Sequence, residues 1–189
     1  MVAIRKSGLL LKPKGHWDGN PNYEWTIRGR SDATYASNLE NRRSVTGYSV
    51  FFEEAPVALK SGGQTSVTLS SAESELASGT QCAQDMLYTM HIVESIGLKV
   101  KKPMILEMDN KGAVGICNNW SVGGRTRHVD VRQYFLRELK EEGIIVTKWL
   151  SGKDMSSDLF TKNLARPLFE KHTRVYVGED EYMHKTRDG

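Results

Sequence analysis

The sequence has few cysteines, no long apolar run and no leader pattern. Cys82 and Cys117 are its two cysteines, and neither belongs to a CxxC or Cys/His spacing, which argues against a zinc site and against a disulfide-stapled fold. No apolar run approaches the roughly 20 residues that a membrane-spanning helix needs, and no signal-peptide pattern opens the chain. We therefore expect two reduced core thiols in a soluble intracellular chain, or in a fragment of one.

The chain also lacks a large excess of positive or negative charge. The 189 residues include 26 lysines and arginines against 23 aspartates and glutamates, a net charge of +3, so overall charge does not identify a nucleic-acid binder. No glycine-rich phosphate loop follows a predicted strand, which argues against a small-molecule kinase or phosphatase. The length suits one core. We expect a domain over residues 25–168, an N-terminal extension or upstream remnant over 1–24, and a mobile tail over 169–189.

Hydrophobic periodicity predicts strands first and then alternating helices and strands. The predicted strands lie at residues 25–35, 46–52, 56–61 or 65–70 (or both), 104–108 and 144–150. The predicted helices lie at residues 70–97, 111–119, 129–143 and 155–164. The first three strands read as antiparallel, and the helical crossovers then add parallel strands. The predicted fold class is therefore α/β, with a mixed five-stranded sheet and helices on both faces.

Four acids recur at special places in this layout. Asp32 lies in the first strand and Glu75 in the first turn of the long helix, while Asp109 ends the fourth strand and Asp158 opens the last helix. If the first and fourth strands are neighbours, these acids face one cleft at the edge where ligands usually bind. Carboxylates this close repel one another unless divalent cations neutralise them, and oxygen ligands suit Mg²⁺ or Mn²⁺. Two such ions about 4 Å apart can catalyse phosphodiester cleavage.

Each acid also has a structural interpretation. Glu73 follows Ser70 by three residues, so it is better explained as the partner in a capping box than as a ligand. Asp109 can simply terminate its strand, and Asp158 can be a charge that favours a helix N-terminus. Taken singly the acids are weak signals, and their joint placement in one topology favours the metal site.

Five segments of the chain carry a recognisable pattern, and in order they read SDATYASNLENRRSVTGYSVFF, KSGGQTSVTLSSAESELASG, LEMDNKGAVGI, GRTRHVDVRQYFLRELKEEG and SSDLFTKNL. Together they resemble the ribonuclease H domain of copia-type LTR-retrotransposon polyproteins. The resemblance implies the ribonuclease H fold and hydrolysis of the RNA strand of RNA–DNA hybrids made during reverse transcription. It also implies the reverse transcriptase domain of the parent polyprotein as a partner, and a location in the cytoplasm, a virus-like particle or the nucleus.

The family's four metal-binding acids carry over onto Asp32, Glu75, Asp109 and Asp158. The resemblance thus implies two Mg²⁺ ions as cofactors, with Mn²⁺ as a substitute. We expect Asp32 and Asp109 to contact both ions, with Glu75 on the leaving-group side and Asp158 on the water side. The chain departs from many cellular ribonucleases H at one place. They have a histidine in the loop before the last acid, whereas the corresponding loop here, SGKDMSS, has none. Lys153 or Asp154 would have to replace it, or the step is slower.

Candidate contacts with the nucleic acid are polar or basic side chains near the predicted cleft. RNA is distinguished from DNA by its 2′-OH, for which Glu75 and the amides of Asn110 and Gln64 are candidates. Phosphate affinity comes from clustered cations, which favours the basic stretch 125–128 and Lys153. That stretch can equally be a solvated loop that caps the next helix. The candidates are thus Asn110, Gln64, Arg125, Arg127, His128 and Lys153.

Two other functions fit the same fold. A degenerate domain would only scaffold a polymerase or bind nucleic acid, but such a domain gains nothing from clustered, uncompensated carboxylates. An integrase-like nuclease, which breaks DNA strands, has its glutamate on a late helix, whereas Glu75 lies on the first long helix. Ribonuclease H activity is therefore the preferred prediction, and the inactive scaffold is the alternative.

Overall fold

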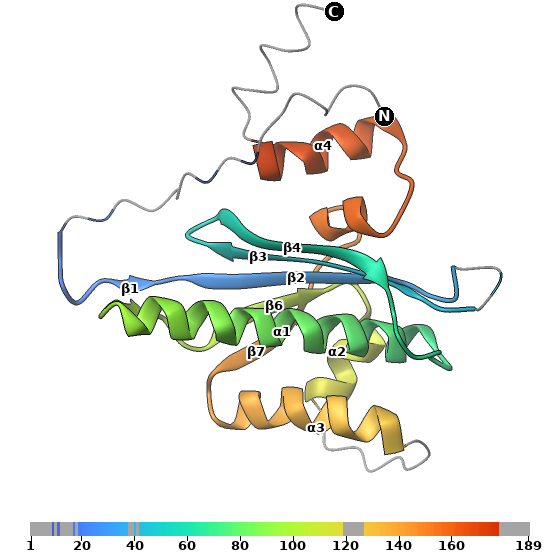
Figure 1. Ribbon diagram of the computed structural model, residues 1–189, viewed down its shortest axis with the longest axis horizontal. Coiled ribbons are helices and arrows are strands. Elements are labelled where there is room, and N and C mark those ends of the chain that lie inside the picture. Colours follow the sequence, from blue (N-terminus) through green and yellow to red (C-terminus); the bar gives the residue numbers. More distant parts are fainter. Residues whose placement is uncertain are drawn as a thin grey trace, which may run out of the picture.

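A computed structural model describes residues 19–37, 42–118 and 127–177, together with Leu9, Leu11, Trp17 and Glu40, and for residues 127–130 it describes the backbone alone. The centre of the molecule is a five-stranded sheet of order β4–β3–β2–β6–β7 (Figure 1). Its strands are β2 (Ile27–Thr34), β3 (Val45–Phe52), β4 (Ala55–Gly63), β6 (Met104–Met108) and β7 (Ile145–Trp149). Strands β2, β3 and β4 are antiparallel, whereas β6 is parallel to β2 and β7 to β6. The predicted mixed five-stranded sheet is confirmed.

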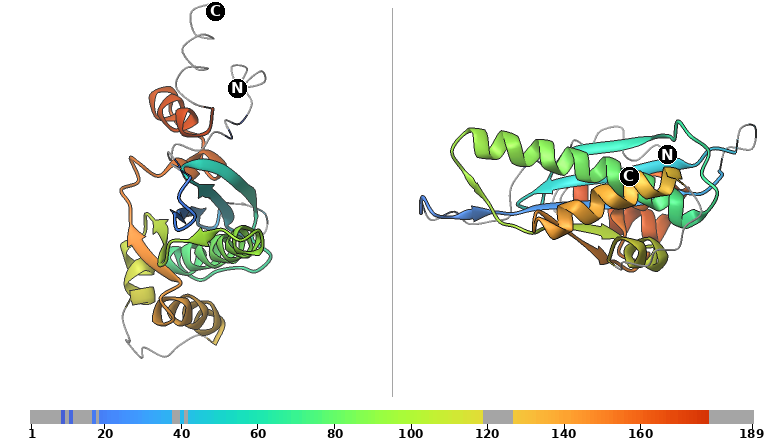
Figure 2. Two further views of the ribbon diagram at one scale, coloured as in Figure 1. Left: turned by 90° about the vertical axis from the view of Figure 1, so that its left-hand side faces the viewer. Right: turned by 90° about the horizontal axis from the view of Figure 1, so that it is seen from below.

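Helices cover both faces of this sheet. They are α1 (Ser71–Ser95), α2 (Lys111–Asn118), α3 (Arg127–Glu141), the short 3-10 helix η1 (Ser156–Phe160) and α4 (Arg166–Val177). Figures 1 and 2 show α1, α2 and α3 on one face, and η1 with α4 on the other. The short parallel strands β1 (Glu24–Trp25) and β5 (Lys99–Val100) form a second, two-stranded sheet. None of the described helices combines the length and the apolar character that crossing a membrane requires.

The long helix α1 packs directly on the central strands. Leu76, Ala83 and Met90 are buried against the sheet, in agreement with the hydrophobic periodicity that predicted this helix. The close approach depends on Gly29 of β2, because a Cβ atom there would lie 2.5 Å from Sδ of Met86 and 2.6 Å from Sγ of Cys82. Cys82 and Cys117 are both free and buried, as expected.

The start of α1 is capped as the sequence predicts. The hydroxyl of Ser70 accepts a hydrogen bond from the backbone N–H of Glu73 at 3.1 Å. The carboxylate of Glu73 accepts one from the backbone N–H of Leu69 at 2.7 Å, so the capping role of Glu73 is confirmed. The alternative strand at residues 65–70 is wrong, because this segment leads from β4 into the cap.

The C-terminal part of the fold differs from the prediction. The mobile tail expected from residue 169 onward is wrong for residues 169–177, which belong to α4. The ring of Tyr176 stacks on Phe51 with centroids 5.9 Å apart, and its hydroxyl lies 3.1 Å from Oγ of Ser49. The predicted helix at 155–164 is reduced to η1. Hydrophobicity did not reveal α4 because its buried face mixes polar with apolar residues, namely His172, Thr173, Tyr176 and Val177.

Candidate metal centre

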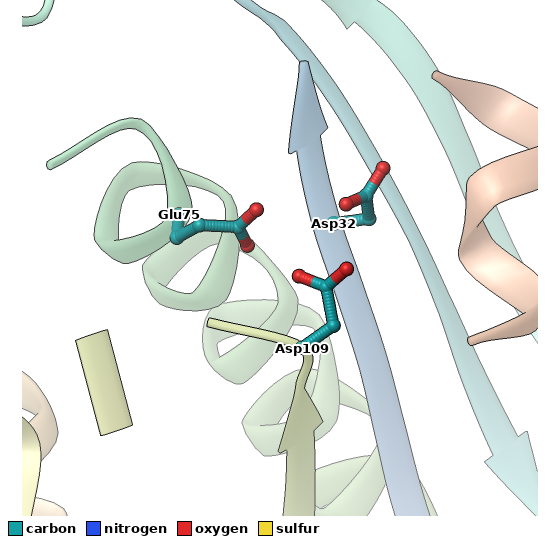
Figure 3. A group of neighbouring side chains, drawn as sticks. All are labelled: Asp32, Glu75 and Asp109. Carbon is teal, nitrogen blue, oxygen red and sulfur yellow. The ribbon is translucent and has the colours of Figure 1, made fainter. Parts of the chain in front are cut away.

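Three of the four predicted acids meet at the carboxyl end of the central parallel strands. Ser31 of β2 pairs with Met108 of β6, so Asp32 and Asp109 follow at the same edge of the sheet. Glu75 reaches them from the N-terminal part of α1, and the carboxylates lie beside one another (Figure 3). One carboxylate oxygen from each of these three acids lies within 4.8 Å of the others. The predicted adjacency of the first and fourth strands is therefore confirmed.

Hydrogen bonds between α1 and β2 hold Glu75 in this position. The backbone N–H of Ala33 donates to Oε1 of Glu75 at 3.1 Å. The hydroxyl of Ser78 donates to the backbone carbonyl of Asp32 at 2.9 Å. The second carboxylate oxygen of Glu75 is buried and has no hydrogen-bond partner among the residues that the structure describes. A buried oxygen without a donor is costly, and a bound cation would satisfy it.

Burial and neighbouring charges raise the pKa values of two of these acids, Glu75 and Asp109. Burial, followed by the charges of Asp32 and Asp109, raises the pKa of Glu75 from 4.5 to about 9. Burial and the charge of Asp32 also raise the pKa of Asp109, while Lys162 acts in the opposite direction. At neutral pH without a metal ion, Glu75 therefore holds a proton, and cation binding would release it. A set of oxygen donors of this kind suits a hard cation such as Mg²⁺ or Mn²⁺.

The fourth acid joins the cluster through a lysine. Asp158, in η1, is buried, but among the described acids the group within 4.8 Å of one another does not include it. The ammonium of Lys162 lies 2.9 Å from Oδ1 of Asp158, 3.1 Å from Oδ1 of Asp32 and 3.7 Å from Oδ2 of Asp109. Burial raises the pKa of Asp158 to about 6, although the hydrogen bond from Lys162 acts against this rise. Lys162 was not among the site residues predicted from the sequence. Its position four residues after Asp158, a spacing that brings side chains together on a helix, could have indicated the contact.

A glycine in β3 lets this C-terminal segment approach the sheet. Gly47 is paired with Asp32 across β2 and β3, and a Cβ atom at Gly47 would lie 2.5 Å from Cγ2 of Thr161. The hydroxyl of Thr161 donates a hydrogen bond to the carboxylate of Asp32. The missing side chain at Gly47 therefore allows Thr161, and with it Lys162, to lie against Asp32.

Two of the predicted nucleic-acid contacts make hydrogen bonds within the fold, and for Asn110 contact with the nucleic acid stays a prediction. Gln64 is buried, and its amide donates to Oγ1 of Thr46 and to the carbonyl of Ser74, both at 3.0 Å. It ties the end of β4 to α1, which corrects the expectation that it faces a substrate. Asn110 is half-buried, and its Oδ1 accepts a hydrogen bond from the backbone N–H of Ala113 at 3.0 Å, which caps α2.

The other predicted contacts are described only in part. Arg125 lies outside the described residues, and Arg127 and His128 lie in the first turn of α3, where only the backbone is described. Lys153 is exposed in the loop between β7 and η1, and its carbonyl accepts a hydrogen bond from the ammonium of Lys171 at 2.7 Å. The role of these residues in nucleic-acid binding stays a prediction.

An aromatic ring beside Asp109 was not among the predicted site residues. Trp149, the last residue of β7, is 47% exposed, and its indole N–H donates to the carbonyl of Asp109 at 2.9 Å. The ammonium of Lys111 lies 4.5 Å from the centroid of the indole ring. A ring and a cation therefore border the acids on the side of β7.

The chain is similar to parts of retrotransposon polyproteins. It is 28% identical over 144 residues to a retrovirus-related Pol polyprotein from transposon TNT 1-94 of Nicotiana tabacum, a match that covers 76% of this chain and 11% of that protein. It is 27% identical over 145 residues to the one from transposon RE1 of Arabidopsis thaliana, covering 77% and 10%. The chain thus spans about a tenth of the length of the curated relatives it matches. No protein-family model matches the chain.

Solved ribonuclease H structures share the fold. LC11-RNase H1, isolated from compost by a metagenomic approach, aligns with a TM-score of 0.53 and 13% identity over 72% of this chain and 92% of that chain. The same protein in complex with an RNA/DNA hybrid aligns with a TM-score of 0.52 and 10% identity over 72% and 94%. The ribonuclease H-like fold is therefore confirmed. The similarity to plant-transposon Pol polyproteins confirms the predicted resemblance to the ribonuclease H domain of a copia-type polyprotein.

Proposed function

We propose that this domain is a metal-dependent endoribonuclease that hydrolyses the RNA strand of RNA–DNA hybrids during retrotransposon reverse transcription. One observation carries the proposal: Asp32, Glu75 and Asp109 meet at the carboxyl end of the parallel strands of a ribonuclease H-like sheet. The similarity to Pol polyproteins supplies the context of reverse transcription. A bound cation would also satisfy the buried oxygen of Glu75 that has no hydrogen-bond partner within the described part of the chain.

The four acids would hold two Mg²⁺ ions, with Mn²⁺ as a substitute. Asp32 and Asp109 would contact both ions, with Glu75 on the leaving-group side and Asp158 on the water side. When bound, two such ions polarise the attacking water and neutralise the leaving oxygen of a phosphodiester. The part played by the chain is to fix the donors in advance. The N–H of Ala33 orients one oxygen of Glu75, and Glu75 gives up its proton when the cation binds.

The hybrid would bind along the same edge of the sheet. The exposed ring of Trp149 offers a surface for a sugar, and the ammonium of Lys111 beside it suits a phosphate. Lys153 adds an exposed cation in the loop before η1. Contacts of these kinds do not depend on base sequence, as the cleavage of a reverse-transcribed hybrid requires. The reverse transcriptase domain of the parent polyprotein would supply further affinity.

Cleavage of defined duplexes tests the proposal. The purified protein is incubated with end-labelled RNA annealed to DNA, and with RNA–RNA and DNA–DNA duplexes, each in Mg²⁺, Mn²⁺ or a chelator. We expect metal-dependent cleavage of the RNA in the hybrid alone. Asp109→Asn should abolish cleavage, whereas Glu138→Gln should retain it, because Glu138 is an exposed acid of α3 outside the cluster.

The same experiment separates the nuclease from the inactive scaffold. A folded protein that binds the hybrid but cleaves it with neither metal ion would reject the nuclease and favour the scaffold. Cleavage that persists in the chelator, or in Asp109→Asn, would reject the assignment of the acids as metal ligands.

A further inference from the structure

Lys162 places its ammonium among the carboxylates that the proposed function assigns to metal ions. The nitrogen lies 2.9 Å from Asp158, 3.1 Å from Asp32 and 3.7 Å from Asp109. The side chain of Lys162 is 34% exposed, whereas those of Asp32 and Asp158 are 1% and 7% exposed. One cation of the chain itself therefore neutralises part of the charge of three clustered acids.

The backbone fixes the start of this lysine side chain but leaves its end free to move. The N–H of Lys162 donates to the carbonyl of Asp158 at 2.9 Å, which continues the turn of η1 and brings both side chains to one side. The neighbouring Thr161 is anchored to Asp32 by its hydroxyl. A lysine stem has four flexible carbons, so the ammonium can leave the acids while the backbone stays in place.

The ammonium and a divalent cation require the same oxygens. Mg²⁺ binds oxygen ligands at about 2.0–2.1 Å, so an ion bound to the oxygens that the ammonium now contacts would lie at most about 5 Å from that nitrogen. Two positive charges at this separation repel one another in a partly buried site. Only one of the two cations can therefore keep full contact with Asp32 and Asp158 at any one time.

We propose that Lys162 is an internal counter-cation, which a divalent ion must displace from Asp32 and Asp158 to fill the second metal position. The inference rests on the proposed metal-dependent function and adds a competition to it. In the metal-free domain the ammonium holds the acids of β2 and η1 together. When the ion binds, the lysine stem moves toward solvent, and this exchange weakens binding of the ion relative to the acids alone.

Isothermal titration calorimetry with MgCl₂ measures the competition directly, without any nuclease assay. Lys162→Met keeps most of the stem and removes the charge. Lys148→Met removes the same charge from an exposed lysine of β7 outside the cluster and is the matched control. We expect Lys162→Met to bind Mg²⁺ at least about tenfold more tightly than wild type, and the control to match wild type. Equal or weaker binding by Lys162→Met overturns the inference.

An NMR titration of the wild-type protein covers the case in which Lys162→Met does not fold. The ¹⁵N signal of the Lys162 ammonium is assigned by its loss in Lys162→Arg and is followed as MgCl₂ is added. We expect it to move to the position of a solvent-exposed lysine as the ion binds. An unmoved signal during Mg²⁺ binding overturns the competition but leaves the metal-dependent nuclease intact. If wild type binds neither Mg²⁺ nor Mn²⁺, the proposed function fails, and the competition fails with it.

Discussion

Replacing Glu75 by glutamine should remove much of the pH dependence of stability in the metal-free domain. Burial and the charges of Asp32 and Asp109 raise the pKa of Glu75 from 4.5 to about 9. Between these two values, the folded protein carries a proton on Glu75 that the unfolded chain has released. Because folding then takes up a proton, the free energy of unfolding falls as the pH rises from 4.5 toward 9.

The size of the effect follows from one proton. A difference of one bound proton changes the free energy of unfolding by about 1.4 kcal/mol per pH unit. The proton that folded Glu75 holds should therefore lower the free energy of unfolding by about 3 kcal/mol between pH 6 and pH 8. Glutamine has nearly the shape of the protonated side chain and carries no charge, so Glu75→Gln preserves the folded site and abolishes the titration. The stability of the variant should fall by about 3 kcal/mol less over this interval.

Urea unfolding at pH 6, 7 and 8 in a chelator measures this difference. Glu138→Gln should follow wild type, because Glu138 is exposed on α3. Saturating Mg²⁺ should flatten the decline in wild type, since a bound ion stabilises the ionised form of Glu75. Parallel curves for wild type and Glu75→Gln in the chelator would show that Glu75 is already ionised in the folded protein, and the reasoning from burial would be refuted.

Three further substitutions test the contacts around the site. Gly47→Ala places a Cβ atom 2.5 Å from Thr161 and should cost about 1–3 kcal/mol in urea unfolding and reduce hybrid cleavage. Gly62→Ala, which has open space in the adjacent strand, is its control, and equal losses in both would contradict the close approach. Gln64→Ala should cost roughly 1–3 kcal/mol with unchanged hybrid affinity of the folded protein by fluorescence anisotropy; weaker binding would restore Gln64 as a substrate contact. Tyr176→Ala should cost about 3–5 kcal/mol in thermal or urea unfolding, whereas no loss would mean that α4 is not part of the folded core.

The acids could be predicted because local patterns determine their places. A hydrophobic run that ends in Asp109 predicts a strand end, and helical crossovers predict that this strand runs parallel to the one with Asp32. Parallel neighbours bring their carboxyl ends together, as the register of Ser31 with Met108 shows. The roles of Glu73 and Glu75 could also be distinguished from local sequence, because the cap formed by Ser70 is a contact within four residues.

The contacts that could not be predicted depend on packing between distant segments. Gln64 has a turn-like setting in the sequence, and its burial follows only from the positions of Thr46 and Ser74 around it. The helix that carries Tyr176 was missed because its buried face includes the polar residues His172 and Thr173. Lys162 looks like an ordinary lysine of a helix end until the fold brings Asp32 to it.

The bond between Asp32 and Lys162 joins residues that are 130 positions apart in the chain. During synthesis the N-terminal parts of a chain are made and begin to fold first, so the strand with Asp32 leaves the ribosome long before η1. Until the segment with Asp158 and Lys162 docks over Gly47, the earlier acids lack both their fourth member and their counter-charge. In a nascent chain, therefore, the cluster of four acids is incomplete until β7 and η1 are in place.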